Sequence, residues 1–169
     1  LLHIPNFIDT KSFPAPLTKP DMNTLLFIGR LEYRKGVDLV VQAFAELSQK
    51  YSKLKLIVLG EDTDAWSIDG ERTIFSKYVT SLGLPKSILR KITFVPQINQ
   101  RSRLAAYLLK HRGIAVLPSR YEPFGFVYIE AMMAGNITIA STRGSGSEII
   151  KNGQDGFIVE PNVEEIIKT

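Results

Sequence analysis

The segment Ile114-Ala-Val-Leu-Pro-Ser-Arg-Tyr-Glu-Pro-Phe-Gly-Phe-Val-Tyr-Ile-Glu-Ala-Met-Met-Ala-Gly135 has the pattern of a buried strand, a tight loop and an apolar helix. Its two glutamates, Glu122 and Glu130, are eight residues apart in the sequence. From residue 123 to residue 142, Glu130 is the only side chain with a charge. A carboxylate in such an apolar helix costs free energy unless something hydrogen-bonds it. We therefore expect a ligand or a fixed internal partner at Glu130.

On both sides of this segment, short apolar strands alternate with amphipathic helices. We expect strands at residues 25–28, 54–59, 92–95, 114–117, 137–141 and 156–159. We expect helices over 37–51, around 72–82, near 101–110, from 125 onward and over 163–169. Repeated strand–helix units predict an α/β, Rossmann-like fold, in which a six-stranded parallel sheet has helices on both faces.

The composition is that of one ordinary domain of 169 residues, with 44% hydrophobic residues. The net charge of +4 suits an anionic ligand but is too small to imply nucleic acid. The absence of cysteine excludes disulfides and thiolate catalysis, and neither His3 nor His111 sits in a metal-ligand motif. No apolar run is long enough to span a membrane. The chain begins at Leu1 and ends in a helical pattern, so we interpret it as an excerpt of a longer protein.

The expected topology brings two loops together. In a doubly wound sheet of order 3-2-1-4-5-6, the first and fourth strands are neighbours at the topological switch point, where ligands bind. The loop after the first strand carries Arg30 and Lys35, and the loop after the fourth carries Glu122 and the start of a new helix at Gly125. We therefore expect these four features to line one crevice.

The crevice predicts a specific ligand chemistry. A helix N-terminus offers free amide donors and a partial positive charge, Gly125 lets an anion approach the backbone, and Arg30 and Lys35 add two positive charges. This combination favours a diphosphate. Glu130, farther along the helix, would point back toward its start and accept hydrogen bonds from ribose hydroxyls. The predicted ligand is a nucleoside diphosphate with a further group attached.

Each of these residues also has a plainer interpretation. Glu130 could be satisfied by its own sheet, Arg30 and Lys35 could be surface charges, and Glu122 could complement the helix dipole. We interpret the pair in Asp62-Thr63-Asp64 as solvated, and the basic residues around Arg101 and Arg103 as an exposed face. The segment Thr142-Arg143-Gly144-Ser145-Gly146-Ser147-Glu148 looks like a further loop at the ligand edge. The chain has no Gly-x-Gly-x-x-Gly fingerprint after its first strand and no P-loop, which disfavours dinucleotide oxidoreductases and P-loop nucleotidases.

Several motifs, in the right order, resemble the group 1 glycosyltransferases. The segment from Glu122 to Gly135 resembles their Glu-x7-Glu signature, and Phe27-Ile28-Gly29-Arg30-Leu31 with Lys35-Gly36 resembles their Gly-Arg-Leu…Lys-Gly segment. Ile4-Pro5-Asn6-Phe7-Ile8-Asp9 resembles the strand that opens their C-terminal domain. Their closing segment is similar to Ser147-Glu148-Ile149-Ile150, Asn152-Gly153 and Gly156-Phe157-Ile158-Val159. The likeness covers almost the whole chain.

The resemblance implies a retaining enzyme of GT-B fold that uses a nucleotide sugar. Residues 1–169 would be its single donor-binding, C-terminal domain, and the N-terminal acceptor domain would be absent from this chain. The expected partners are the donor and that domain, with no nucleic acid. No cofactor is implied beyond the substrate itself, and a metal is usually dispensable in this family. We expect a cytoplasmic protein, with peripheral contact at the inner face of the membrane left open.

The resemblance also implies a role for each site residue. Arg30 and Lys35 would hold the donor diphosphate, Glu130 the ribose, and Glu122 the transferred sugar. Catalysis would rest on Glu122, Arg30 and Lys35. The remaining donor contacts would come from the backbone at Phe124, Gly125 and Phe126 and, beside the base, from the segment of residues 94–98 with Val95 and Ile98.

The chain departs from the family pattern at positions outside this constellation. Pro96 replaces a frequent glycine beside the base, Phe7 replaces a glycine, and Gly60-Glu61-Asp62 stands where Gly-x-Gly is common. Gly135-Asn136-Ile137-Thr138 stands where Gly-x-Pro-Val is common. Other interpretations stay open: a GT-B epimerase or phosphorylase, a non-catalytic nucleotide-binding module, or an α/β domain with no nucleotide site.

Overall fold

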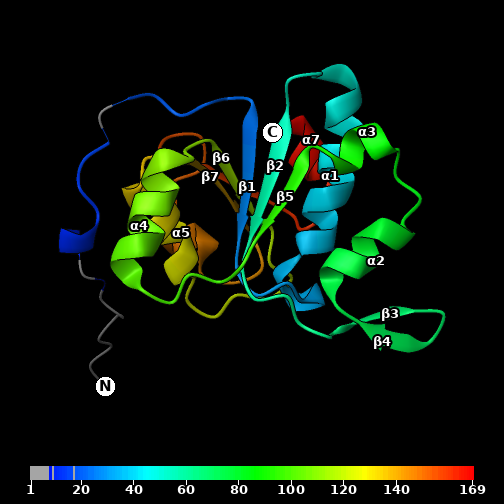
Figure 1. Ribbon diagram of the computed structural model, residues 1–169. Helices are drawn as coiled ribbons and strands as arrows, with labels where there is room; N and C mark the ends of the chain where they lie inside the picture. Colours follow the sequence, from blue (N-terminus) through cyan, green and yellow to red (C-terminus); the bar gives the residue numbers. More distant parts are fainter. Residues whose placement is uncertain (1–7, 9, 17) are drawn as a thin grey trace.

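The computed structural model describes residues 8, 10–16 and 18–169. The segment Ile4–Asp9, which resembles the opening strand of the family domain, therefore lies outside the described residues except for Ile8. The described part is built around one large sheet, with helices packed on both of its faces (Figure 1).

The large sheet has six strands, all parallel, in the order β5-β2-β1-β6-β7-β8. This confirms the predicted sheet and its 3-2-1-4-5-6 order. The sequence bounds agree with the predictions to within one residue at each end. The strands are β1 (Thr24–Ile28), β2 (Lys55–Leu59), β5 (Ile92–Val95), β6 (Ile114–Leu117), β7 (Ile137–Ser141) and β8 (Phe157–Val159).

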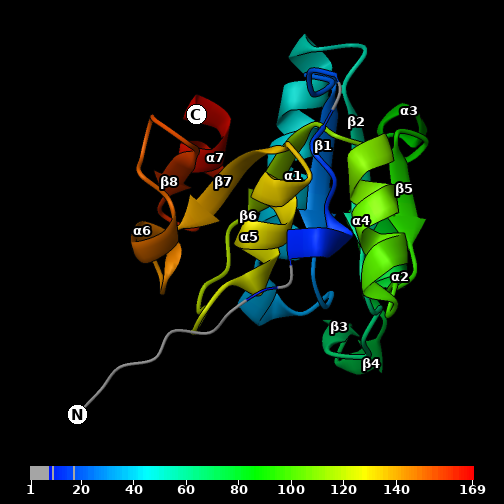
Figure 2. The same ribbon diagram turned by 90° about the vertical axis from the view of Figure 1, so that its left-hand side faces the viewer.

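Helices cover both faces, as predicted. One face carries α1 (Val37–Lys50), α2 (Phe75–Ser81), α3 (Lys86–Leu89) and α7 (Val163–Lys168). The other carries α4 (Arg101–Lys110), α5 (Phe126–Met133) and the single turn α6 (Gly146–Ile149). In Figure 2, α4 and α5 lie in front of the sheet and α1 lies behind it. Two 3-10 turns, η1 (Thr10–Ser12) and η2 (Tyr33–Lys35), complete the helical elements.

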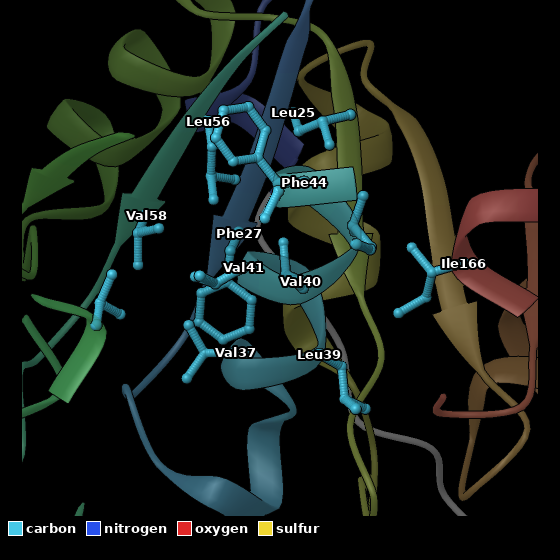
Figure 3. Close-up of a cluster of buried hydrophobic side chains, with 14 of the residues drawn as sticks. Leu25, Phe27, Val37, Leu39, Val40, Val41, Phe44, Leu56, Val58 and Ile166 are labelled. Carbon is cyan, nitrogen blue, oxygen red and sulfur yellow. The ribbon is translucent and has the colours of Figure 1, made fainter. Parts of the chain in front are cut away.

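The larger of the two clusters of buried hydrophobic side chains includes the residues packed between α1 and the sheet. Val37, Val40 and Phe44 recur at helical spacing, so they share one face of α1, and each is fully buried. Figure 3 shows this face packed on Phe27 and Leu56, which belong to β1 and β2. Burying a side chain of this size stabilises the fold by about 1.5 to 3 kcal/mol. The packing fixes the start of α1, and with it the loop that joins β1 to α1.

One predicted helix begins later than expected. The helix placed around 72–82 begins at Phe75, and Arg72 and Thr73 belong to β4 (Glu71–Thr73), which pairs antiparallel with β3 (Trp66–Ile68). The turn between these strands is Asp69-Gly70, and both residues have positive φ, 52° and 87°. Asp-Gly favours such a two-residue hairpin turn. The hairpin lies near the carboxyl ends of the large sheet's strands, at the bottom of Figure 1.

The start of α2 explains a second correction. The carboxylate of Asp62 accepts hydrogen bonds from the backbone N–H groups of Phe75, at 2.7 Å, and Ser76, at 3.3 Å. Asp62 therefore caps α2 from a distant loop. The interpretation of the Asp62-Thr63-Asp64 pair as merely solvated was therefore wrong for Asp62, whereas the Asp64 side chain is 70% exposed, as expected.

Candidate functional site

A cleft of about 550 Å³ opens at the carboxyl ends of β1 and β6. This is the topological switch point, where the sheet order reverses direction. Its lining comes from the loops after β1, β2, β5 and β6 and from the start of α5. The residues singled out in the sequence that line it are Arg30, Lys35, Glu122, Phe124, Gly125, Phe126, Glu130 and Ile98.

Lys35 and Glu122 form an ion pair across the cleft. The Lys35 ammonium contacts the Glu122 carboxylate directly, and their side chains are only 16% and 9% exposed. The Ser119 hydroxyl donates a second hydrogen bond to the same carboxylate oxygen, at 3.3 Å. Glu122 makes no capping hydrogen bond at the start of α5. Its role as a simple companion of the helix dipole is therefore less fitting than a role inside the cleft.

Arg30 leaves most of its charge available to a ligand. Its side chain is 54% exposed, and its one ion pair among the described residues is a long one, with Glu32 at 3.5 Å. Arg34 holds the same Glu32 carboxylate more tightly, at 2.7 Å, and donates to the Tyr121 carbonyl at 3.0 Å. Arg34 and Lys35 are thus closely paired with acidic side chains in the cleft, whereas most of the Arg30 side chain is exposed.

The N-terminus of α5 faces the cleft. Gly125, Phe126 and Val127 line it, and no side chain of residues 8, 10–16 or 18–169 caps the helix. The first amides of a helix have no intrahelical partner, so these donors are available to an anion. Gly125 has φ of +79°, and a Cβ there would lie 2.4 Å from the buried ring of Tyr128. Only glycine fits this backbone conformation so close to the Tyr128 ring.

Glu130 has a fixed partner that the sequence did not indicate. The Arg101 guanidinium, from α4, lies 3.5 Å from the Glu130 carboxylate, whose side chain is 13% exposed. The description of Arg101 as part of a solvated face was therefore incomplete. The Glu130 carboxylate lines the cleft, and Arg101 is its one hydrogen-bond partner within the part of the chain that the structure describes. It can accept further hydrogen bonds from a ligand.

Glu130 should make stability depend on pH in a specific direction. Burial raises the pKa of Glu130 above its ordinary value of 4.5, and Arg101 opposes the shift in part. Above pH 4.5 the folded chain therefore binds more protons than the unfolded chain, so this group's contribution to stability falls as the pH rises. Replacing Glu130 by Gln removes that dependence. We expect the free energy of unfolding of Glu130→Gln, relative to that of wild type, to be higher near pH 7 than near pH 4.

Urea unfolding of both proteins at the two pH values checks this. Glu148→Gln serves as the control, because Glu148 is exposed on α6. Its difference from wild type should not change in that direction. A Glu130→Gln difference that is the same at both pH values would contradict the assignment.

The segment 142–148 is hydrogen-bonded to the loop that carries Glu122. The backbone N–H of Glu122 donates to the Arg143 carbonyl at 3.0 Å, and that of Ser145 donates to the Glu122 carbonyl at 3.2 Å. The Ser145 hydroxyl also donates to the Phe124 carbonyl. The segment was expected to be a loop at the ligand edge, but its last residues form the first part of α6 and none of it lines the cleft.

Two differences concern the set of lining residues. Val95 lies at the end of β5 beside a neighbouring depression, and does not line the cleft with Ile98. Gln97, which belongs to the predicted base-contact segment 94–98, lines the cleft. Arg34, Glu61 and Tyr121 also line it and were not singled out. Arg34 and Tyr121 stand one residue from Lys35 and Glu122, so the two loops themselves were the signal. Glu61 follows the end of β2, which gave a weaker signal.

The model of the family described as "Glycosyl transferases group 1" matches residues 9–169. The chain belongs to this family. A Mycobacterium tuberculosis glycogen synthase is 35% identical over 161 residues, which are 94% of this chain and 36% of that protein. A mannosylfructose-phosphate synthase of Agrobacterium fabrum is 30% identical, over 93% of this chain and 36% of that protein.

Solved structures share the fold, among them one of a group 1 glycosyltransferase family protein. The C-terminal domain of LpcC from Francisella tularensis aligns with a TM-score of 0.74 and 26% identity, over 96% of this chain and 85% of that chain. A sucrose-phosphate synthase of Thermosynechococcus elongatus aligns with a TM-score of 0.72 and 28% identity, over 95% of this chain and 40% of that one. These likenesses confirm the expected C-terminal half of a GT-B fold. The chain spans about a third of the length of the glycogen synthase it matches.

The part of this chain that the structure describes has neither a membrane-spanning helix nor a metal-binding cluster of acidic, histidine or cysteine side chains. No helix among those residues is long and apolar enough to cross a bilayer. No three of the described His, Asp or Glu side chains gather as metal ligands would.

Proposed function

We propose that this chain is the donor-binding domain of a retaining glycosyltransferase. The enzyme would move a hexose from a nucleoside diphosphate sugar to an acceptor hydroxyl. One observation carries the proposal: Lys35 paired with Glu122, the exposed Arg30 and the uncapped start of α5 all meet in one cleft at the switch point. Positive groups for a diphosphate and a carboxylate for a sugar thus lie side by side.

The reaction would draw on this arrangement as follows. The bond between the anomeric carbon and the diphosphate breaks, and the electron pair leaves with the diphosphate. Arg30, Lys35 and the amides at the start of α5 stabilise the charge that develops there, each by about 3 kcal/mol. Glu122 holds the sugar hydroxyls and stabilises positive charge on the ring. The acceptor hydroxyl bonds through its oxygen to the same face of that carbon and gives its proton to the departing diphosphate, so the configuration is retained.

The two cations and the helix end would supply the positive charge that a bound metal supplies elsewhere. We therefore propose that donor binding needs no metal. Glu130 would accept hydrogen bonds from the ribose, and the backbone near Ile98 would lie beside the base.

Relatives support the transferase assignment and a two-domain enzyme. Their names describe synthases of glycogen and sucrose, and of mannosylfructose phosphate. We propose that the acceptor-binding domain lies outside residues 1–169, and that the enzyme acts in the cytoplasm in polysaccharide synthesis. This domain alone should then bind donor without transferring sugar. Transfer by the isolated chain would contradict that part of the proposal.

Calorimetric titration with UDP, GDP and ADP, without added metal, tests the site. We expect one nucleoside diphosphate to bind, with affinity about tenfold lower in Arg30→Ala and in Lys35→Ala, since each removes a charge-assisted contact. Lys53→Ala is the matched control, because Lys53 is exposed before β2, at the opposite end of the sheet. Equal binding by all four proteins would rule out this cleft as the diphosphate site.

A product assay on the full-length enzyme separates transfer from related reactions. A lengthened acceptor with retained configuration supports the proposal. An epimerised nucleotide sugar would indicate an epimerase, and a sugar phosphate would indicate a phosphorylase.

A further inference from the structure

A buried ion pair behind the cleft has no part in the proposed chemistry. Asp38, in the first turn of α1, is 6% exposed, and Arg120 holds it with two hydrogen bonds, at 2.8 Å and 2.7 Å. Among the described residues, no other side chain bonds the Asp38 carboxylate. A buried carboxylate that depends on one partner makes that partner's position well defined.

Arg120 is also fixed by Tyr33 of η2. Its guanidinium lies over the Tyr33 ring, 3.6 Å from the ring centre, and donates to the Tyr33 carbonyl. A guanidinium on an aromatic face adds a cation–π attraction to the hydrogen bonds. Its side chain is 22% exposed and is not part of the cleft lining. Arg120 therefore faces away from the ligand, toward α1 and η2.

Successive residues of the loop after β1 contact successive residues of the loop after β6. The Arg120 N–H donates to the Arg34 carbonyl at 2.8 Å, and the Arg34 guanidinium donates to the Tyr121 carbonyl at 3.0 Å. The next residue of each loop completes the series, because Lys35 pairs with Glu122. Arg120 thus stands at the start of a run of contacts that ends at the two charged groups of the cleft.

We propose that the Arg120–Asp38 pair is a positioning element that sets the Lys35 ammonium against the Glu122 carboxylate. This inference rests on the proposed function. Arg120 touches neither phosphate nor sugar. It anchors the loop after β6 to the start of α1, and so keeps η2, with Lys35, in register with that loop. Arg30 lies before η2 and does not contact Arg120, so its contribution to binding is independent of the pair.

A double-mutant cycle on diphosphate affinity tests this independence. The nucleoside diphosphate that binds wild type is titrated into Arg120→Gln and Asp38→Asn, each alone and combined with Lys35→Ala or Arg30→Ala. We expect either single variant to bind about tenfold more weakly, and Lys35→Ala to cost much less in either background than in wild type. The cost of Arg30→Ala should stay the same. A general loss of fold would reduce both costs alike.

Asp38→Asn and Tyr33→Leu perturb the position of Arg120 while retaining most of the surrounding packing. Asp38→Asn preserves shape. Tyr33→Leu keeps the backbone and removes the ring's contacts with Arg120 and, edge-on, with Trp66, from a residue that is 61% exposed. Both variants should therefore fold. We expect Tyr33→Leu to weaken the Lys35 contribution in the same direction by a smaller factor. Lys35→Ala costs that are unchanged in Asp38→Asn and Tyr33→Leu would overturn the positioning role while leaving the diphosphate site intact. Equal binding by wild type, Lys35→Ala and Arg30→Ala would instead overturn the proposed function.

Discussion

Glu122→Gln is expected to lower sugar transfer by the full-length enzyme at least about a hundredfold, without lowering the affinity of this domain for a nucleoside diphosphate. Glu122 is the acidic partner of Lys35 in the cleft, and it is nearly buried. A neutral amide keeps the shape but cannot stabilise positive charge on a sugar ring. The amide no longer holds the Lys35 ammonium by charge. The Arg120–Asp38 pair still keeps η2 in place, so the ammonium stays in the cleft and is available to a phosphate. The rate of sugar transfer should therefore fall while the affinity for the nucleoside diphosphate does not.

Initial rates and calorimetric titration together check this separation. Glu148→Gln is the matched control, because it makes the same chemical change at an exposed residue outside the cleft. It should change the rate less than about threefold, as expected for a surface substitution. Full activity in Glu122→Gln would show that the domain binds nucleotide without taking part in transfer. A parallel loss of affinity would instead make Glu122 a diphosphate-binding residue.

The fold could be predicted from the sequence because its signals are local. The strands of the large sheet are short, mainly apolar runs, and four of the six (β1, β2, β5 and β6) are followed directly by Gly or Pro. The helices between them have apolar residues at helical spacing. The doubly wound order then places Arg30, Lys35 and Glu122 together, as the structure shows. The hairpin at Trp66 was missed, although Asp69-Gly70 is a recognisable turn signal.

The partners of the charged side chains could not be predicted in the same way. Glu130 meets Arg101, from α4, and Asp38 meets Arg120, 82 residues away. Such pairs depend on how two helices or loops pack across the sheet, and many exposed arginines could have served. The sequence indicated that Glu130 needs a partner, because its surroundings are apolar. Only the packing of α4 beside α5 decides which arginine is near enough.

Gly144→Ala is expected to lower the free energy of unfolding by at least about 3 kcal/mol. Gly144 has φ of +136°, in a region that side chains rarely adopt, and a Cβ there would lie 1.9 Å from the Glu122 carbonyl oxygen. The clash is with backbone, so no side-chain rotation relieves it. The same carbonyl accepts the Ser145 N–H. Relief of the clash must therefore move the loop that carries Glu122.

Gly83→Ala is the control that separates the clash from the conformational strain. Gly83 also has positive φ, +67°, but a Cβ there would meet nothing within 4 Å. Its cost should be about 1 to 2 kcal/mol, the strain of a left-handed residue alone. Urea unfolding followed by the fluorescence of Trp66, the single tryptophan, measures both variants. Equal losses would mean that the Glu122 loop yields without cost, and such a loop could not hold a carboxylate firmly against Lys35.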